Sequence, residues 1–147
     1  MKLVDANVLL YAVNEDAEHH EDARGWLDDA LSGAASVGLA WVPVLAFLRL
    51  STRVDLFPRP LSVSAAVDVV QDWLSQPSAE VVHPTARHLD VMGSLLAQVG
   101  SGGNLVSDAH LAALAVEHRA EIVSYDNDFS RFPGVRWERP VSPARRP

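Results

Sequence analysis

The sequence predicts an α/β fold, namely a three-layer α/β/α sandwich with a mainly parallel central sheet. Three observations lead to this prediction. Short apolar runs alternate along the chain with longer segments whose apolar residues recur at helical spacing. The length of 147 residues, with 48% hydrophobic and 21% charged residues, is typical of one folded domain. Finally, Asp5 directly follows the first short run, at the carboxyl end of a strand, where open α/β sheets bind their ligands.

The first half of the chain contains two predicted strands and three predicted helices. The segment 17–31 carries apolar residues on one helical face and acidic residues on the other, and the apolar segment 41–51 tolerates Pro43 in its first turn. The expected elements are a strand at Lys2–Val4, a helix beginning around Asn7, a helix at Ala17–Leu31, a strand at Ser36–Ala40 and a helix at Trp41–Ser51.

The second half continues the alternation after a proline-containing loop at 57–60. Ser62, Thr85 and Asn104 are residue types that cap helices, and each stands before an apolar periodic segment. The expected elements are helices at about 63–75, from Thr85 to about Val99 and from Asn104 to about His118, with strands at Glu80–Val82 and Ile122–Ser124. We expect one domain over residues 1–140 and a flexible C-terminal tail over 141–147.

Composition excludes several classes of function. The chain has no cysteine, which rules out disulfides, thiolate zinc sites and cysteine nucleophiles and agrees with a cytoplasmic location. No apolar stretch approaches the roughly 20 residues that span a bilayer, so we expect no membrane partner. The net charge of −7 is unfavourable for binding nucleic acid unless bound metal ions reverse the sign locally.

Aspartates occur where a parallel sheet would gather them. Asp5 follows the first strand, Asp108 lies about one turn into a helix, and Asp126 follows the strand at 122–124, with Asp128 two residues later. Converging carboxylates repel one another unless a cation neutralises them. Oxygen ligands from separate elements suit hard divalent ions such as magnesium or manganese. The sequence therefore predicts a divalent metal site.

A simpler interpretation stays open for some of these residues. Asp5 and Asn7 are good helix-capping residues, and Asp126 is a common turn residue, so local sequence explains them about equally well without a metal. Asp108 is harder to explain in this way, because its helix is largely apolar and a buried aspartate needs a partner.

Three segments carry a resemblance to a known family. They are VDANVLLYAV at 4–13, GNLVSDAHLAALAVEH at 103–118 and IVSYDNDFSRFPGVRW at 122–137. In their order and spacing they resemble PIN-domain proteins, specifically the VapC toxins of bacterial toxin–antitoxin pairs, over nearly the whole chain. The resemblance implies a PIN-like α/β/α sandwich, an endoribonuclease that depends on Mg²⁺ or Mn²⁺, a homodimer, an RNA substrate and a VapB-type antitoxin partner.

The resemblance also implies roles for individual residues. Asp5 matches the family's first acidic ligand, Asp108 the acid on the helix after the glycine loop, and Asp126 the acid after the last inner strand. Asp128 matches an accessory acid. Asn7 matches a small polar position that orients the first ligand or binds a water. Asp5, Asp108 and Asp126 are thus the expected catalytic residues, and all four aspartates are expected metal ligands.

One position departs from the family pattern. The family has a glutamate in a motif like LLEFLR, whereas this chain has VLAFLRL at 44–50, with Ala46 in place of the acid. In the family that acid helps to bind metal and to activate the attacking water. Three explanations are open: a deliberate inactivating substitution, a naturally weakened member, or a glutamate supplied from elsewhere. We favour the first, because the rest of the pattern is intact.

Two alternative functions remain open, and RNA binding would need basic residues near the acids. A haloacid-dehalogenase-like phosphatase also begins with an aspartate after its first strand, but it needs a second aspartate where this chain has Asn7. With Ala46, the chain is alternatively a module that binds antitoxin or metal without cutting RNA. Arginines would have to steer RNA to the acids, and the candidates are Arg49, Arg53, Arg59 and Arg131.

Overall fold

One parallel sheet forms the middle layer of the molecule. The computed structural model describes all 147 residues, and its five strands lie in the order β3-β2-β1-β4-β5, every neighbouring pair being parallel. The strands are β1 (Lys2–Val4), β2 (Val37–Ala40), β3 (Ala79–Val82), β4 (Glu121–Val123) and β5 (Trp137–Glu138). In the register of the central strand, Leu3 pairs with Gly38 on one side and with Ile122 on the other. The predicted α/β fold is confirmed.

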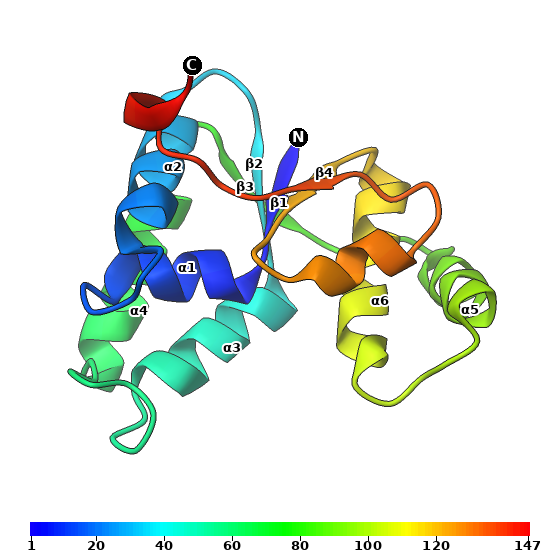
Figure 1. Ribbon diagram of the computed structural model, residues 1–147, viewed down its shortest axis with the longest axis horizontal. Helices are drawn as coiled ribbons and strands as arrows, with labels where there is room; N and C mark the ends of the chain where they lie inside the picture. Colours follow the sequence, from blue (N-terminus) through cyan, green and yellow to red (C-terminus); the bar gives the residue numbers. More distant parts are fainter.

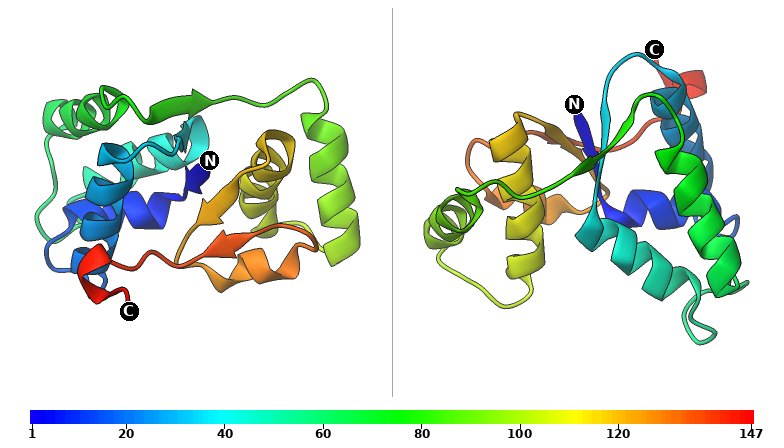
Figure 2. Two further views of the ribbon diagram at one scale, coloured as in Figure 1. Left: turned by 90° about the horizontal axis from the view of Figure 1, so that it is seen from above. Right: turned by 180° about the vertical axis from the view of Figure 1, so that it is seen from behind.

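Helices cover both faces of this sheet. Figures 1 and 2 show one group of helices on one side of the sheet and a second group on the other, with both chain ends near the same end of the molecule. The first group comprises α1 (Ala6–Val13), α2 (His20–Ser32), α3 (Trp41–Ser51) and α4 (Val63–Leu74); the second comprises α5 (His88–Val99) and α6 (Leu105–His118). Two short 3₁₀ helices follow, η1 (Asn127–Arg131) and η2 (Pro143–Arg145). No helix has the length and apolar character needed to cross a membrane.

Each face of the sheet has its own apolar core. Leu3 and Val4 are adjacent in β1 and both fully buried, yet they belong to different cores, because successive side chains of a strand point to opposite faces. Phe47 fills the core under α1–α4, and Phe129 fills the core under α5 and α6. Strands β1 and β2 are therefore almost continuously apolar, as in sheets buried on both sides.

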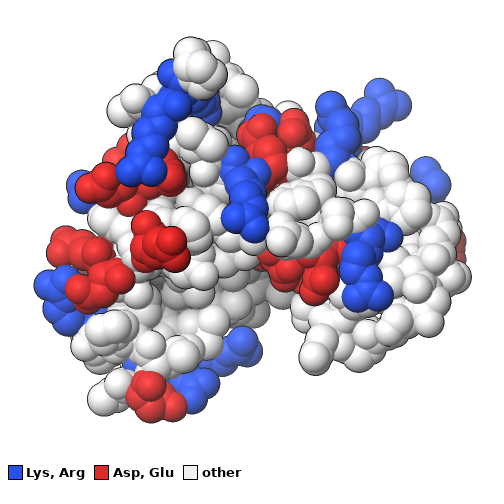
Figure 3. Space-filling view, viewed as in Figure 1, with Lys and Arg blue, Asp and Glu red and all other residues white.

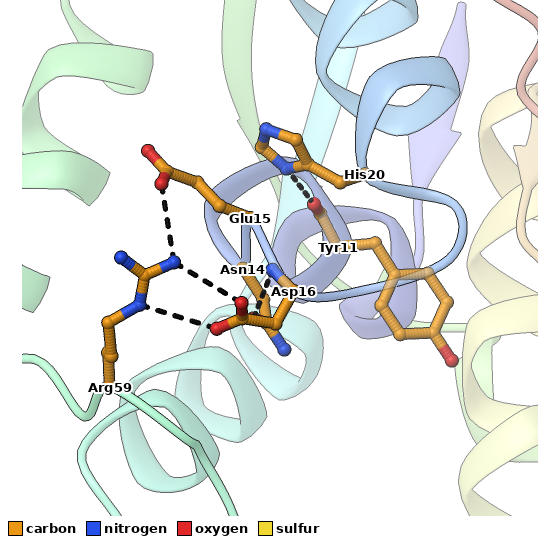
Figure 4. Close-up of polar contacts among 6 residues, drawn as sticks. All are labelled: Tyr11, Asn14, Glu15, Asp16, His20 and Arg59. Atoms are coloured by element: carbon orange, nitrogen blue, oxygen red, sulfur yellow. Dashed lines mark hydrogen bonds and ion pairs between the residues drawn. The ribbon is translucent and has the colours of Figure 1, made fainter.

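The start of α2 differs from the prediction, because a turn after α1 occupies the residues expected to begin it. Asn14 Oδ1 accepts a hydrogen bond from Asp16 N at 3.1 Å, and His20 Nδ1 bonds the Tyr11 carbonyl at 2.8 Å (Figure 4). The Asx turn made by Asn14 competes with helical hydrogen bonding. The helix consequently begins at His20 and not at Ala17.

The start of α5 differs for a tertiary reason. Thr85 does not stand at the N-cap of this helix. Its Oγ1 donates to Glu117 on α6 and accepts from Arg87 N at 3.2 Å, and its backbone N–H donates to the same carboxylate at 3.0 Å, so its bonds hold the turn before the helix. The helix begins at His88, with Arg87 at the N-cap position. Asn104 does stand at the N-cap of α6, as predicted, but its side chain makes no capping hydrogen bond.

The chain after β4 contains structure that the sequence did not reveal. β5 is only two residues long and pairs with β4 through Ile122 and Trp137, so it has no periodic pattern of its own. In segment 141–147, Ser142 N donates to Asp22 Oδ1 at 3.2 Å. A Cβ atom added to Gly25 would lie 2.5 Å from Ser142 Oγ, so the glycine permits a close approach of this segment to α2. The flexibility of the segment stays a prediction.

Candidate metal centre

The site lies at the carboxyl ends of the two central strands. β1 and β4 pair in register through Val4 and Val123, which places the next residues, Asp5 and Ser124, side by side. Asp5 N donates to the Val123 carbonyl at 3.0 Å and extends this pairing by one step. The chain then turns into α1 after β1 and toward η1 after β4. Side chains that are 119 residues apart therefore meet at one sheet edge.

Three aspartates form a tight group at this edge. One carboxylate oxygen from each of Asp108, Asp126 and Asp128 lies within 4.8 Å of the others, and all three residues are half-buried. Asp108 comes from the first turn of α6. Asp126 is the N-cap of η1, and its Oδ1 accepts from Asp128 N at 2.8 Å, which folds the two acids of the D-N-D sequence together. In Figure 3 acidic side chains gather beside η1, at the indentation between the two halves of the molecule.

Asp5 lies beside this group and not within it. Its Oδ1 accepts from Ala6 N at 2.7 Å, and its Oδ2 accepts from Ser124 Oγ at 2.7 Å and Asn7 Nδ2 at 3.2 Å. The capping role considered for Asp5 is thus confirmed, because it is the N-cap of α1. The capping role does not exclude metal binding by Asp5. Asp5 lies close enough to the group for its charge to raise the pKa of Asp108 and for the charge of Asp126 to raise the pKa of Asp5.

Asn7 and Ser124 hold the site together through hydrogen bonds. Ser124 is fully buried; its Oγ donates to Asp5, accepts from Asn7 Nδ2 at 3.0 Å and accepts from Asp126 N at 2.9 Å. Asn7 Oδ1 accepts from Tyr125 N at 3.1 Å. Asn7 therefore orients Asp5, as the resemblance implies, and does not cap α1. The sequence interpretation missed Ser124, although a polar residue directly after a buried strand and two positions before Asp126 was a usable signal.

The electrostatics show negative charge that the protein does not neutralise. Burial, and to a smaller extent the charges of Asp126, Asp5 and Asp128, together raise the pKa of Asp108 from its usual 3.8 to about 6. Burial also raises the pKa of Asp5, against the lowering effect of the hydrogen bonds from Ser124 and Ala6. The ion pairs of the protein involve none of these four acids.

The donor set fits a hard divalent cation. The donors of the tight group are carboxylate oxygens that converge from α6 and η1, with Asp5 beside them at the start of α1, and no ion pair offsets their mutual repulsion. Ala46 lies partly buried on α3, which begins directly at the carboxyl end of β2. The carboxylates that come within metal-ligand reach of one another are those of Asp108, Asp126 and Asp128, and this group contains no glutamate.

Comparisons with known proteins agree with this geometry. Residues 2–135 match the model of the PIN domain. Ribonuclease VapC37 of Mycobacterium tuberculosis (strain ATCC 25618 / H37Rv) is 66% identical over 140 residues, which cover 95% of this chain and 97% of that protein. Ribonuclease VapC33 of the same strain is 37% identical over 141 residues, covering 96% and 99%.

Solved structures show the same fold at low sequence identity. The VapBC2 complex of Rickettsia felis bound to a promoter DNA fragment contains a chain with a TM-score of 0.67 and 20% identity, covering 94% of this chain and 97% of that one. VapC20 of Mycobacterium tuberculosis, described as a sarcin-ricin loop cleaving toxin, gives 0.66 and 19%, covering 92% and 99%. A haloacid-dehalogenase-like phosphatase is therefore the wrong alternative: this chain belongs to the PIN-domain family and, within it, to the VapC ribonucleases.

Proposed function

We propose that this chain is the toxin of a type II toxin–antitoxin pair and acts as a metal-dependent endoribonuclease. The observation that carries the proposal is the group of Asp108, Asp126 and Asp128, which gathers within 4.8 Å without a basic partner at the carboxyl edge of the sheet. The names of the relatives, several of which are ribonucleases, support RNA as the substrate. Without a cation, this arrangement would only destabilise the fold.

The metal would be held by these three aspartates, with Asp5 as a fourth ligand, directly or through a water. Magnesium and manganese are both compatible with an all-oxygen donor set. The bound cation would supply Lewis-acid chemistry, offsetting the negative charge that develops on the phosphoryl oxygens during hydrolysis. The residues around the aspartates contribute by orienting these ligands. Asn7 and Ser124 fix the orientation of Asp5, and the backbone N–H of Asp128 fixes Asp126.

Ala46 favours a second candidate function. The glutamate that the family uses beside the metal is absent here, and the carboxylate group contains only aspartates. A chain in this state would retain the fold and bind a cation but cleave RNA slowly, acting chiefly as a binding module for its antitoxin. The two candidates share every structural feature described above and differ only in the rate of cleavage.

The remaining partners follow from the family. Solved relatives include VapBC complexes, and some of these contain DNA, which in one case is a promoter fragment. We propose that a VapB-type antitoxin binds this chain, that the chain forms a homodimer, and that both occur in the cytoplasm, where the RNA is found. Co-expression with VapB-type antitoxins and measurement of mass in solution test the first two points.

RNA cleavage under controlled metal conditions tests the main proposal. The chain is incubated with labelled single-stranded RNA and with magnesium, manganese or a chelator. We expect cleavage with either metal, none with the chelator, and none for Asp108→Asn. Asp68→Asn is the matched control, because Asp68 is an exposed acid on α4. Absence of cleavage by a folded, metal-binding wild type would favour the binding module, and equal cleavage by both variants would overturn the assigned site.

A further inference from the structure

An acidic protein that binds RNA must hold phosphate with specific cations. The chain carries 12 lysines and arginines against 19 acids, so its overall field repels RNA. A cation serves this purpose only if it lies near the acid group and is not already paired with a carboxylate. These two conditions can be applied to every lysine and arginine in the structure.

Five of the 12 cations are already paired with carboxylates and fail the second condition. Arg59, a candidate from the sequence, bonds Asp16 and Glu15 (Figure 4), and Arg53, another candidate, forms a two-point pair with Asp55. Lys2 contacts Glu121 and Glu138, while Arg24 and Arg145 pair with acids on α2. The expectation that Arg53 and Arg59 steer RNA is not supported, because their charge is already balanced locally.

Five of the other seven cations lie away from the acid group. Arg119 and Arg136 line a shallow pocket at the amino end of the sheet, opposite the acids. Arg87 lies in a groove of about 400 Å³ along α5. Arg146 and Arg139 line the same cavity over α2, but only Arg139 bonds a residue of η1, which carries the acids. Arg49 stands eight residues into α3, roughly 12 Å along the helix from the sheet edge at 1.5 Å per residue. Two cations remain, Arg131 and Arg139.

Arg139 is the one of these two that the structure fixes in place. It follows β5, and its Nη2 donates to Asn127 Oδ1 at 2.9 Å. Asn127 stands between Asp126 and Asp128, the two acids of η1. Arg139 is exposed and pairs with no carboxylate, so its remaining N–H donors are free. In Figure 3 basic side chains flank the central acidic group, over η1 and over the segment that follows β5.

We propose that Arg139, held by Asn127 beside the acid group, binds a phosphate of the RNA next to the one that is cleaved. A guanidinium presents its donors in a plane that matches two phosphate oxygens, and the bond to Asn127 orders the side chain before RNA arrives. Arg131, at the end of η1, adds charge but has no bond that orders it. This proposal rests on the ribonuclease function and names the residue that gives the RNA its position.

Replacement of Arg139 by glutamine, with Arg59→Gln as the matched control, tests the proposal. Both changes remove one positive charge from an exposed arginine. Binding of a single-stranded phosphorothioate RNA is measured by fluorescence anisotropy at several salt concentrations, and KM and kcat are measured with ordinary RNA. We expect Arg139→Gln to weaken binding and raise KM roughly tenfold. The salt slope should fall by about 0.7, while Arg59→Gln stays within about twofold of the wild type.

Two further measurements separate RNA binding from a merely structural role. Arg139→Lys keeps the charge and should recover part of the lost affinity, and calorimetry should show unchanged metal affinity for Arg139→Gln. Equal RNA binding by Arg139→Gln and Arg59→Gln would overturn the assignment and leave the ribonuclease function intact. Loss of metal affinity in Arg139→Gln would also overturn it, since the arginine would then serve the acid loop. A wild type that neither binds nor cleaves RNA would overturn both proposals.

Discussion

The hydroxyl of Ser124 donates to Asp5 Oδ2 over 2.7 Å and joins the ends of the two central strands. The same oxygen accepts from Asn7 and from the backbone N–H of Asp126, so one buried atom orients groups from both sides of the site. Removing this hydroxyl would leave its buried partners without hydrogen bonds, and that loss is the main cost of such a substitution to stability.

Ser124→Ala is expected to reduce divalent-metal affinity roughly tenfold and to lower the free energy of unfolding by about 1–3 kcal/mol. The physical reason is the loss of the donor to Asp5 and of the acceptor for Asp126 N. Titration calorimetry and urea unfolding measure the two effects. Ser101→Ala, at an exposed loop serine, is the control and should change neither. Unchanged metal affinity in Ser124→Ala would show that Asp5 needs no such support.

Asp108→Asn is expected to raise the melting temperature of the metal-free protein at pH 7.5. The substitution removes one of several crowded negative charges, and the raised pKa of Asp108 shows that its charged form is unfavourable there. The same change should abolish the stabilisation that added manganese gives the wild type. Thermal unfolding with and without metal measures both. A variant that still gains stability from manganese would remove Asp108 from the ligand set.

The pH dependence should follow the titration of Asp108. Its pKa in the folded protein is raised from about 3.8 to about 6, so between these values the folded state holds more protons than the unfolded state. The contribution of Asp108 to metal-free stability therefore decreases as the pH rises from about 4 to about 6. Unfolding curves of the wild type minus those of Asp108→Asn isolate this contribution. A difference that does not vary with pH would contradict it.

Metal binding should show the opposite trend, because a ligand must be deprotonated to bind a cation. Affinity for manganese is expected to fall as the pH drops below about 6, when Asp108 takes up its proton. Calorimetry at pH 5, 6 and 7.5 tests this. Equal affinities at all three values would mean that Asp108 is not a ligand.

Ala46→Glu is expected to increase magnesium-dependent RNA cleavage by at least tenfold. Ala46 is partly buried on α3, and the added carboxylate would restore the acid that the family uses beside the metal. Ala46→Gln has nearly the same shape without the charge and is the matched control. No gain with glutamate, or an equal gain with glutamine, would show that the missing acid does not limit this chain.

Glu117→Gln is expected to destabilise the packing of α5 on α6 by about 2–3 kcal/mol. Glu117 has a side chain only 3% exposed, and it bonds Thr85 and the Nδ1 of His88 at 2.6 Å. Burial raises the pKa of Glu117, but the hydrogen bonds from Thr85 and His88 lower it by more. Its stabilisation is therefore present above the usual glutamate pKa and lost as the pH falls through the lowered value. Urea unfolding measures the effect, with Glu80→Gln, at an exposed glutamate, as the control.

The sequence by itself determined the α/β class, the order of the helices and strands up to β4 and the positions of the four aspartates. These features depend on local chemistry. Apolar periodicity distinguishes strands from helices, as in Trp41–Ser51, whose bounds the structure matches. An acid that closely follows a parallel strand must also lie near the carboxyl edge of the sheet, which is why Asp5 and Asp126 were recognisable.

Only the tertiary structure decided which groups act together. Asp108, Asp126 and Asp128 form the tight group while Asp5 stands beside it, because both oxygens of Asp5 are bonded to Ala6, Asn7 and Ser124. Thr85 bonds α6 and does not stand at the cap of its own helix, and Arg59 pairs with acids while Arg139 bonds Asn127 and pairs with no carboxylate. Each of these outcomes depends on a partner far away in the chain. Local sequence carries no information about such a partner until the sheet brings the two segments together.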